Sequence, residues 1–207
     1  MSYKKHIILL SALYICTYSF SQTRIKAVGD VMMGSYTPRP VTPKNNGQIF
    51  IDSIAQHLDS ADITFGNIEG VFVTKDLAPK KCKPASREAK RCYEFGMPYL
   101  LSNTFKSLNF DLASLDNNHV SDYGQQGINF TKKRLDSLNI KYGGKKEPVR
   151  FTIDSTDFVL IAFGTSGVSW RVSDLKNAQA IICLLYTSDA ADDSLRVDLG
   201  GRRIIKK

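Results

Sequence analysis

Three apolar segments of this chain each end in a short polar cluster, and this recurrence restricts the possible folds more than any other feature. The segments at residues 25–28, 63–65 and 110–115 have the composition of buried strands. Ligands of open α/β sheets bind in the crevice at the carboxyl ends of the strands, so the pattern predicts a site at one sheet edge. The clusters are Gly29-Asp30, Asn67-Ile68-Glu69 and Asn117-Asn118-His119.

Carboxylates, side-chain amides and an imidazole are the groups that these clusters offer. Hard and borderline divalent metal ions bind this set of donors. A metal-dependent active site, or part of one, is therefore the first hypothesis.

Strands and helices are expected to alternate along the chain, which is typical of an α/β domain whose helices cover a sheet. A hairpin is predicted from residues 151–153 and 158–163, and its second strand is apolar enough to be central in the sheet. About 160 residues between the two ends fit one domain. Further strands are predicted at 24–28, 63–65, 111–115 and 140–142, and helices at 48–58, 99–108, 124–138 and 173–182.

The N-terminal residues 1–21 are typical of a secretory signal peptide. Lys4 and Lys5 precede an apolar stretch from Ile7 to Phe20, and small residues surround the expected cleavage near Ser21. The apolar stretch is short for a membrane span, although an uncleaved anchor is the alternative. We expect an exported protein, located in the periplasm or at the cell surface.

The C-terminal residues 183–207 have no clear period, in contrast to residues 22–182. They resemble a translated sequencing adapter, so we expect a non-native tail and a natural chain that continues further. A genuine disordered tail is the alternative.

The charge of the chain argues against a nucleic-acid partner. The chain has 28 Lys and Arg against 20 Asp and Glu, and seven of the cations and four of the acids lie in the two ends. The remaining surplus of about +5 is modest, and no basic stripe alternates with aromatic residues. The runs at 80–83 and 132–134 are interpreted as solvated faces.

Cys82 and Cys92 are the two cysteines of residues 22–182, and they close a short loop rich in Lys, Arg, Pro and Ser. In an oxidising compartment this pair predicts a disulfide. A zinc site is disfavoured, because the spacing is wrong and no His lies close in the sequence.

The three polar clusters differ in how specific they are. Asp30 follows a glycine, and such a pair is more often a turn than a ligand. Asn117-Asn118-His119, followed by Asp122, is the most specific cluster, because a buried Asn needs partners that a metal ion can provide. His57 lies within the predicted helix 48–58 and is interpreted as a surface or packing residue.

Taken together, the clusters resemble the capsule-synthesis CapA family, which is named for poly-γ-glutamate capsule production and is related to the calcineurin-like metallophosphoesterases. The resemblance covers roughly residues 24–182, and residues 82–92 are similar to a cysteine-bearing subset of the family. It implies an α/β fold with a layered αββα sandwich, incomplete here in its C-terminal half. The matching segments are Gly-Asp-Val-Met-Met-Gly at 29–34, Ala-Asp-Ile-Thr-Phe-Gly-Asn-Ile-Glu-Gly at 61–70 and Phe-Asp-Leu-Ala-Ser-Leu-Asp-Asn-Asn-His-Val-Ser-Asp-Tyr-Gly at 110–124.

The resemblance also implies roles for the residues of the clusters. Asp30, Glu69 and Asn118 would be ligands of a dinuclear metal site, and Asn67 and Asn117 would support them. His119 would donate a proton to the leaving oxygen, and Asp122 would orient it. The ions would be divalent (Mn, Mg, Zn or Fe), and the partners an anionic exopolymer or phosphoester substrate together with capsule-assembly membrane proteins.

The chain departs from the family after His119, because no further His follows it. The His-Gly-x-Glu and Gly-His-x-His motifs of the family are missing, so we expect only the first half of the metal site and a fragment that is inactive alone. Two alternatives to a capsule hydrolase remain. One is a non-catalytic polymer-binding or export scaffold, and the other is a generic exported phosphoesterase or nucleotidase.

Overall fold

The computed structural model describes residues 22–37, 39–144, 146–165, 169–187, 195–197 and 204–206. The expected signal peptide at 1–21 lies outside the described residues, as does most of the expected tail. Within the described part, no helix combines the length and the apolar character that a membrane span requires.

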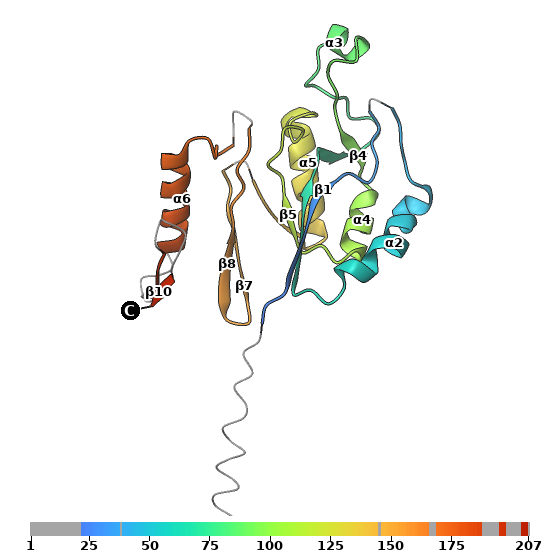
Figure 1. Cartoon of the computed structure of the whole chain (residues 1–207). Helices are drawn as coiled ribbons and strands as arrows, with labels where there is room; N and C mark the ends of the chain where they lie inside the picture. Colours follow the sequence, from blue (N-terminus) through green and yellow to red (C-terminus); the bar gives the residue numbers. More distant parts are fainter. Residues whose placement is uncertain are drawn as a thin grey trace, which may run out of the picture.

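A parallel sheet of four strands forms the centre of the chain (Figure 1). Its order is β1-β2-β5-β6, and every neighbouring pair is parallel, so all four carboxyl ends lie at the same edge. This confirms the α/β class, whereas the finer αββα sandwich stays a prediction. The strands are β1 (Ile25–Val31), β2 (Ile63–Ile68), β5 (Leu112–Ser114) and β6 (Lys141–Gly143).

Helices supply the crossovers between these parallel strands. The apolar period of residues 48–58 predicted the helix α2 (Gln48–Leu58) with its observed bounds. The helix α4 (Leu101–Ser107) precedes β5, and α5 (Gly124–Ser137) precedes β6. A 3-10 turn, η1 (Lys44–Gly47), leads into α2, and α2 and α4 lie together on one side in Figure 1.

A second, small parallel sheet pairs β3 (Val71–Val73) with β4 (Gly96–Pro98), and the sequence did not predict it. Each strand has three residues, too few for a period, but all six are buried. The hydroxyl of Thr131 on α5 accepts from the backbone N–H of Phe72 at 2.9 Å, which ties this sheet to the helix.

The predicted hairpin forms from β7 (Val149–Ile153) and β8 (Thr156–Leu160), but the expectation that β8 is central in the sheet was wrong. Among the described strands, β8 pairs with β7 alone. Its apolar side chains are half-buried, and Phe151 stacks on Phe158 within the hairpin at 5.4 Å between ring centroids. The apolar residues of β8 therefore pack locally, and composition does not distinguish this from a central position.

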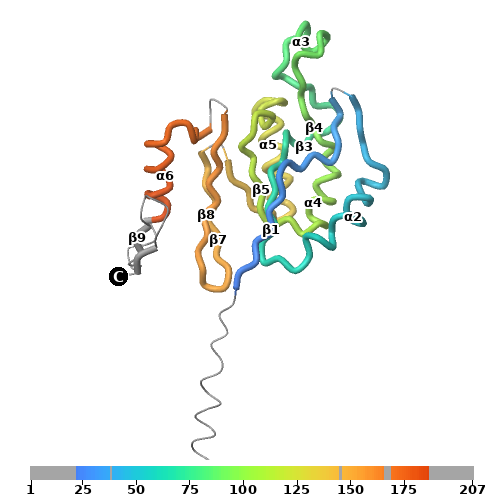
Figure 2. Tube along the Cα trace, viewed as in Figure 1, coloured from blue at the N-terminus to red at the C-terminus, as the bar shows by residue number. Residues whose placement is uncertain are grey.

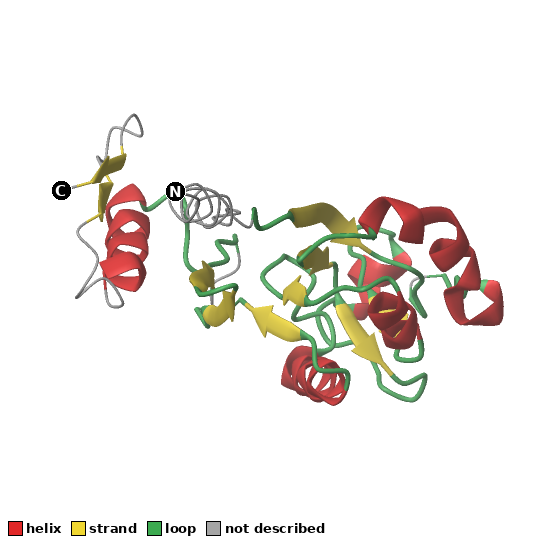
Figure 3. Cartoon of the chain, turned by 90° about the horizontal axis from the view of Figure 1, so that it is seen from below, coloured by secondary structure: helices red, strands yellow, loops and turns green. Residues whose placement is uncertain are grey.

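The last described helix, α6 (Leu175–Thr187), lies on the far side of the hairpin from the central sheet (Figures 2 and 3). It begins close to the predicted start and continues beyond residue 182, through Cys183 into the expected tail. The short strands β9 (Leu195–Val197) and β10 (Ile204–Lys206) form an antiparallel pair within that tail.

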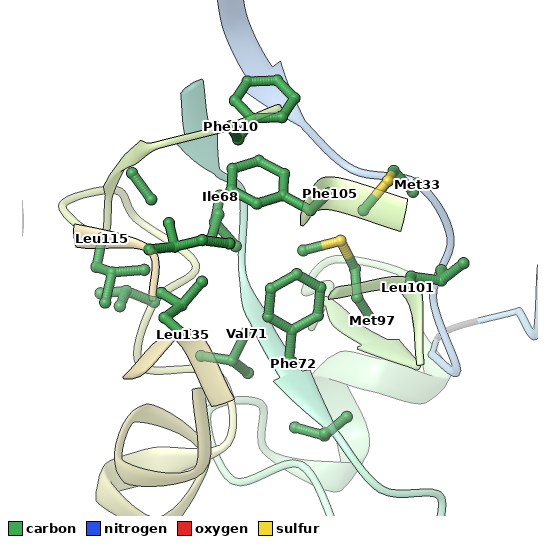
Figure 4. Packing of buried hydrophobic residues seen from close by; sticks show 14 of the residues in the cluster. Met33, Ile68, Val71, Phe72, Met97, Leu101, Phe105, Phe110, Leu115 and Leu135 are labelled. Carbon is green, nitrogen blue, oxygen red and sulfur yellow. The ribbon is translucent and has the colours of Figure 1, made fainter. Parts of the chain in front are cut away.

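The hydrophobic core lies between the central sheet, the small sheet and the helices (Figure 4). Phe105 of α4 stacks on Phe110 at 4.0 Å between ring centroids. Ile68, the last residue of β2, and Leu115, the residue after β5, are buried next to the polar residues of the second and third clusters. Because these apolar anchors are fixed, the polar residues that follow them have little freedom to move.

Candidate metal-dependent active site

Asp30 is brought into the site by an irregularity in β1. The register pairs Ala27 with Phe65 and then Asp30 with Asn67, so β1 contains one residue more than β2 over this stretch. A bulge of this kind re-aims the side chains that follow it. As a result Asp30, instead of Gly29, lies opposite Asn67, and the Asn67 amide donates a hydrogen bond to Asp30 Oδ1 at 2.7 Å.

The amide of Asn67 connects the two candidate carboxylate ligands. Besides its bond to Asp30, Asn67 Nδ2 donates to Glu69 Oε2 at 3.2 Å. Asn67 Oδ1 accepts from Asn117 Nδ2 at 3.1 Å, so the amide is oriented from both sides.

Asn117 fastens the third cluster to the second. Its amide donates to the carbonyl oxygen of Ile68 at 2.7 Å, and its Oδ1 accepts from the backbone N–H of His119 at 3.0 Å. The two Asn residues that the sequence identified as supporting are therefore both engaged by their neighbours.

His119 is held between two carboxylates. Its Nδ1 lies 2.6 Å from Asp122 Oδ2, and its Nε2 lies 3.8 Å from Glu69 Oε1. The ring of Phe95 packs on the imidazole at 4.1 Å between centroids. Because a carboxylate accepts a hydrogen bond, Asp122 favours the tautomer that carries its proton on Nδ1 and leaves Nε2 toward the site.

Asp122 is fully buried behind His119. Its Oδ2 also accepts from the backbone N–H of Phe95 at 2.7 Å. Its Oδ1 has no well-aligned hydrogen-bond donor within the described residues, but the Lys81 ammonium lies 2.9 Å away, so this contact is an ion pair.

The structure does not bring the side chain of Asn118 into this network. Asn118 is exposed, and its backbone carbonyl accepts from the Lys81 ammonium at 2.8 Å. Its side-chain amide makes no hydrogen bond within the described residues. Its role as a metal ligand therefore stays a prediction.

Sequence reasoning missed two contacts of the site. Lys81 belonged to a run interpreted as a solvated face, and Phe95 lies between the second and third clusters, far from both in the sequence. The only available signal was their position beside Cys82 and Cys92, since a disulfide fixes the residues next to it.

Glu69 is a residue of the cluster whose acidity is changed by its surroundings. Burial raises the pKa of Glu69 above its ordinary value, and the nearby Asp30 carboxylate raises it further. The imidazole of His119 and the hydrogen bond from Asn67 act in the opposite direction on this pKa. A cation bound beside Glu69 and Asp30 would relieve both unfavourable effects.

The donors fit a divalent ion of the kind the resemblance implies, but only as part of its coordination shell. Asp30 and Glu69 offer carboxylate oxygens joined through one amide. Within the part of the chain that the structure describes, no three His, Cys, Asp or Glu side chains form a metal site on their own. Since affinity depends on the number of ligands, these residues alone would bind a metal ion weakly.

The predicted disulfide between Cys82 and Cys92 is present, with the two Cα atoms 5.8 Å apart. It closes a loop that contains the short helix α3 (Pro84–Glu88) and projects beyond the carboxyl edge of the sheet (Figure 1). Glu94, which is 2% exposed, anchors the loop by accepting from the backbone N–H of Cys82 at 2.8 Å and pairing with Arg87.

The fold and the site together define an α/β protein with a carboxylate, amide and imidazole cluster at the carboxyl edge of a parallel sheet. The chain belongs to the family described as bacterial capsule synthesis protein PGA_cap, whose model matches residues 24–181. The resemblance to the CapA family is thereby confirmed.

Two relatives from Bacillus agree with this membership. The chain is 28% identical over 166 residues to the PGA biosynthesis protein CapA of Bacillus subtilis (strain 168). The aligned residues make up 75% of this chain and 40% of that protein. The chain is 26% identical over 120 residues to the capsule biosynthesis protein CapA of Bacillus anthracis, covering 58% of this chain and 28% of that protein. The chain therefore spans less than half the length of these relatives.

We predict that Glu69→Gln stabilises the metal-free fold at neutral pH. The raised pKa of Glu69 means that its ionised form is disfavoured in the folded state. The loss of folding stability caused by ionised Glu69 is absent below the ordinary pKa of about 4.3. It grows as the pH rises from that value through the folded-state pKa, and it is fully present above the folded-state pKa. The melting temperature of the variant, measured with a chelator, should exceed that of the wild type at pH 7, and the difference should vanish near pH 4.

The substitution Glu88→Gln, on the exposed helix α3, is the matched control and should change the melting temperature little at either pH. An equal or lower melting temperature for Glu69→Gln at pH 7 would contradict the electrostatic description of the site.

Proposed function

We propose that this chain is part of an exported protein of capsule or poly-γ-glutamate biosynthesis that carries a metal-dependent hydrolase site. Family membership supports the biological process, because the named Bacillus relatives are described as PGA and capsule biosynthesis proteins. The observation that carries the hydrolase part is the continuous set of contacts from Asp30 through Asn67, Glu69 and His119 to Asp122.

Asp30, Glu69 and Asn118 would hold the metal ion in this proposal. Mn, Mg, Zn and Fe ions all accept such oxygen donors. When bound, the ion would polarise a phosphoryl or acyl centre and generate hydroxide near neutral pH.

The other residues of the cluster would supply and orient the acid of the reaction. His119 directs Nε2 toward the carboxylate cluster, where the imidazole would give a proton to the leaving oxygen. Asp122 would hold Nδ1–H, since its carboxylate lies 2.6 Å from Nδ1, so Nε2 would take up a proton from solvent and the resulting imidazolium would pass it to the leaving oxygen. Asn67 and Asn117 would fix the distance between the metal-binding carboxylates and this acid.

We further propose that the complete protein has the layered αββα fold of metallophosphoesterases and that further ligands come from beyond residue 182. Two observations support this. The chain spans 40% of the Bacillus subtilis relative, and its described residues bring together fewer than three His, Cys, Asp or Glu ligands.

We expect the full-length protein that carries this domain to hydrolyse a phosphodiester such as bis(4-nitrophenyl) phosphate, or a γ-glutamyl amide, when Mn²⁺ is supplied. His119→Ala should lower the rate by about 10²–10⁴-fold, because it removes the general acid. Asp30→Ala should abolish the dependence on Mn²⁺.

The control for this experiment is His57→Ala, since His57 is exposed on α2, remote from the cluster, and its loss should leave the rate unchanged. Full activity of His119→Ala, or no metal-dependent hydrolysis of either substrate class, would refute the hydrolase. Nucleotide hydrolysis without any effect on surface polymer would favour a generic phosphoesterase.

A second candidate function is a polymer-binding scaffold, and the disulfide-closed loop favours it. Lys83, Lys90 and Arg91 are exposed on this loop and form no ion pair within the described residues. The loop projects beside the site, so a polyanionic chain of carboxylates would be attracted to the same edge of the sheet.

For the scaffold we predict that the triple variant Lys83→Gln, Lys90→Gln, Arg91→Gln binds labelled poly-L-glutamate roughly tenfold more weakly at low salt, since each exposed charge pair contributes ~0.2–1 kcal/mol. Fluorescence anisotropy measures this, and the loss should shrink as salt is added.

The matched control, Lys44→Gln, Lys133→Gln, Lys141→Gln, removes the same charge from other exposed positions. Equal weakening by both triple variants would show that only net charge matters and would refute a binding role for the loop. Unchanged binding in His119→Ala would separate this function from catalysis.

A further inference from the structure

The buried carboxylate of Asp122 depends on groups from outside its own segment. It is fully buried, and an uncompensated charge in such a position is strongly unfavourable. Two of the groups that surround it, the Lys81 ammonium and the Phe95 N–H, come from the two ends of the disulfide-closed loop. The third group is the imidazole of His119.

The backbone of the loop is attached to the same segment. The N–H groups of Lys80 and Lys81 lie 2.8 and 3.2 Å from the carbonyl oxygen of Asp122 and donate to it. At the other end, the ring of Phe95 covers the imidazole of His119. The loop therefore contacts the His119–Asp122 pair from two directions.

Lys81 makes a second contact that connects it to the third polar cluster. Its ammonium donates to the carbonyl oxygen of Asn118 at 2.8 Å while it lies 2.9 Å from Asp122 Oδ1. One cation thus fixes the backbone just before His119 and the carboxylate that orients the imidazole.

The neighbouring residue explains why Lys81 stays in this position. Cys82 is buried and bonded to Cys92, and its N–H is held by the buried carboxylate of Glu94. A side chain next to such an anchor has far fewer positions available than one on a free loop, so less conformational entropy is lost when it pairs.

We propose that Lys81 is a positioning residue that fixes the His119–Asp122 pair, and that the Cys82–Cys92 loop holds it in place. A role of Lys81 in catalysis rests on the proposed function, whereas its effect on the position of the His119 imidazole does not. Reduction of the disulfide should therefore loosen His119, although within the described residues neither cysteine hydrogen-bonds to it.

The test is the ring NMR spectrum of His119 in protein labelled with ¹⁵N-histidine and treated with a chelator. The chain has three His residues, and loss of one signal in His119→Gln identifies the resonance. In the wild type His119 should be the Nδ1–H tautomer with a slowly exchanging proton. Lys81→Met should accelerate this exchange about tenfold, as expected for the loss of one charge-assisted contact.

Three variants make the result specific. Lys80→Met removes a neighbouring exposed cation and should leave the spectrum unchanged, whereas Lys81→Arg should restore slow exchange. The double variant Cys82→Ser, Cys92→Ser keeps Lys81 and should shift the His119 signal in the same direction as Lys81→Met. Circular dichroism establishes that each variant is folded, and the cysteine variant decides the question if Lys81→Met unfolds.

An unchanged His119 signal in folded Lys81→Met, or an equal change in Lys80→Met, would overturn the inference, as would an unchanged signal in the double cysteine variant. Failure of the hydrolase assay with the expected NMR result would refute the proposed function alone. Hydrolysis with an unchanged NMR signal would refute this inference alone.

Discussion

The amide of Asn117 donates to the carbonyl oxygen of Ile68 and to the side chain of Asn67, and the geometry of the site depends on these two hydrogen bonds. They join the carboxyl ends of β2 and β5, which are neighbours in the parallel sheet. Ile68 and Leu115 are buried in the close-packed core, so Asn67 and Asn117, which lie next to them, have little freedom to move. Carboxylates from β1 and β2 and the imidazole beyond β5 are thus brought to one rim.

The ionised carboxylate of Glu69 at this rim is unfavourable in the metal-free protein, and this favours the binding of a cation. Burial and Asp30 both raise the pKa of Glu69, so ionised Glu69 is less favourable in the metal-free protein than an isolated glutamate would be. Behind the cluster, Asp122 is compensated by Lys81 and by the backbone of Phe95. The front of the site therefore favours a cation, whereas the charge of Asp122 at the back of the site is already paired with Lys81.

The sequence predicted the parts of this structure that follow from local patterns. The helical period of residues 48–58 matched α2, and the apolar runs followed by polar clusters located β1, β2 and β5. The bulge that brings Asp30 opposite Asn67 could not be predicted, because it is a property of the pairing between two strands. For the same reason β3 and β4 were missed, and β8 was expected in a sheet to which it does not belong. The charge run at 80–83 predicted a solvated Lys81, because such a run gives no sign of the buried carboxylate of Asp122, 41 positions later along the chain.

The central claim is that Asp30 and Glu69 face a common divalent cation. Anomalous diffraction from crystals of this domain soaked in Mn²⁺ tests it most directly. The account predicts a manganese peak within coordination distance of both carboxylates, on the side of Glu69 that faces the His119 imidazole. Peaks confined to other acidic side chains, or an ordered Asp30–Glu69 pair without any peak at saturating Mn²⁺, would contradict it.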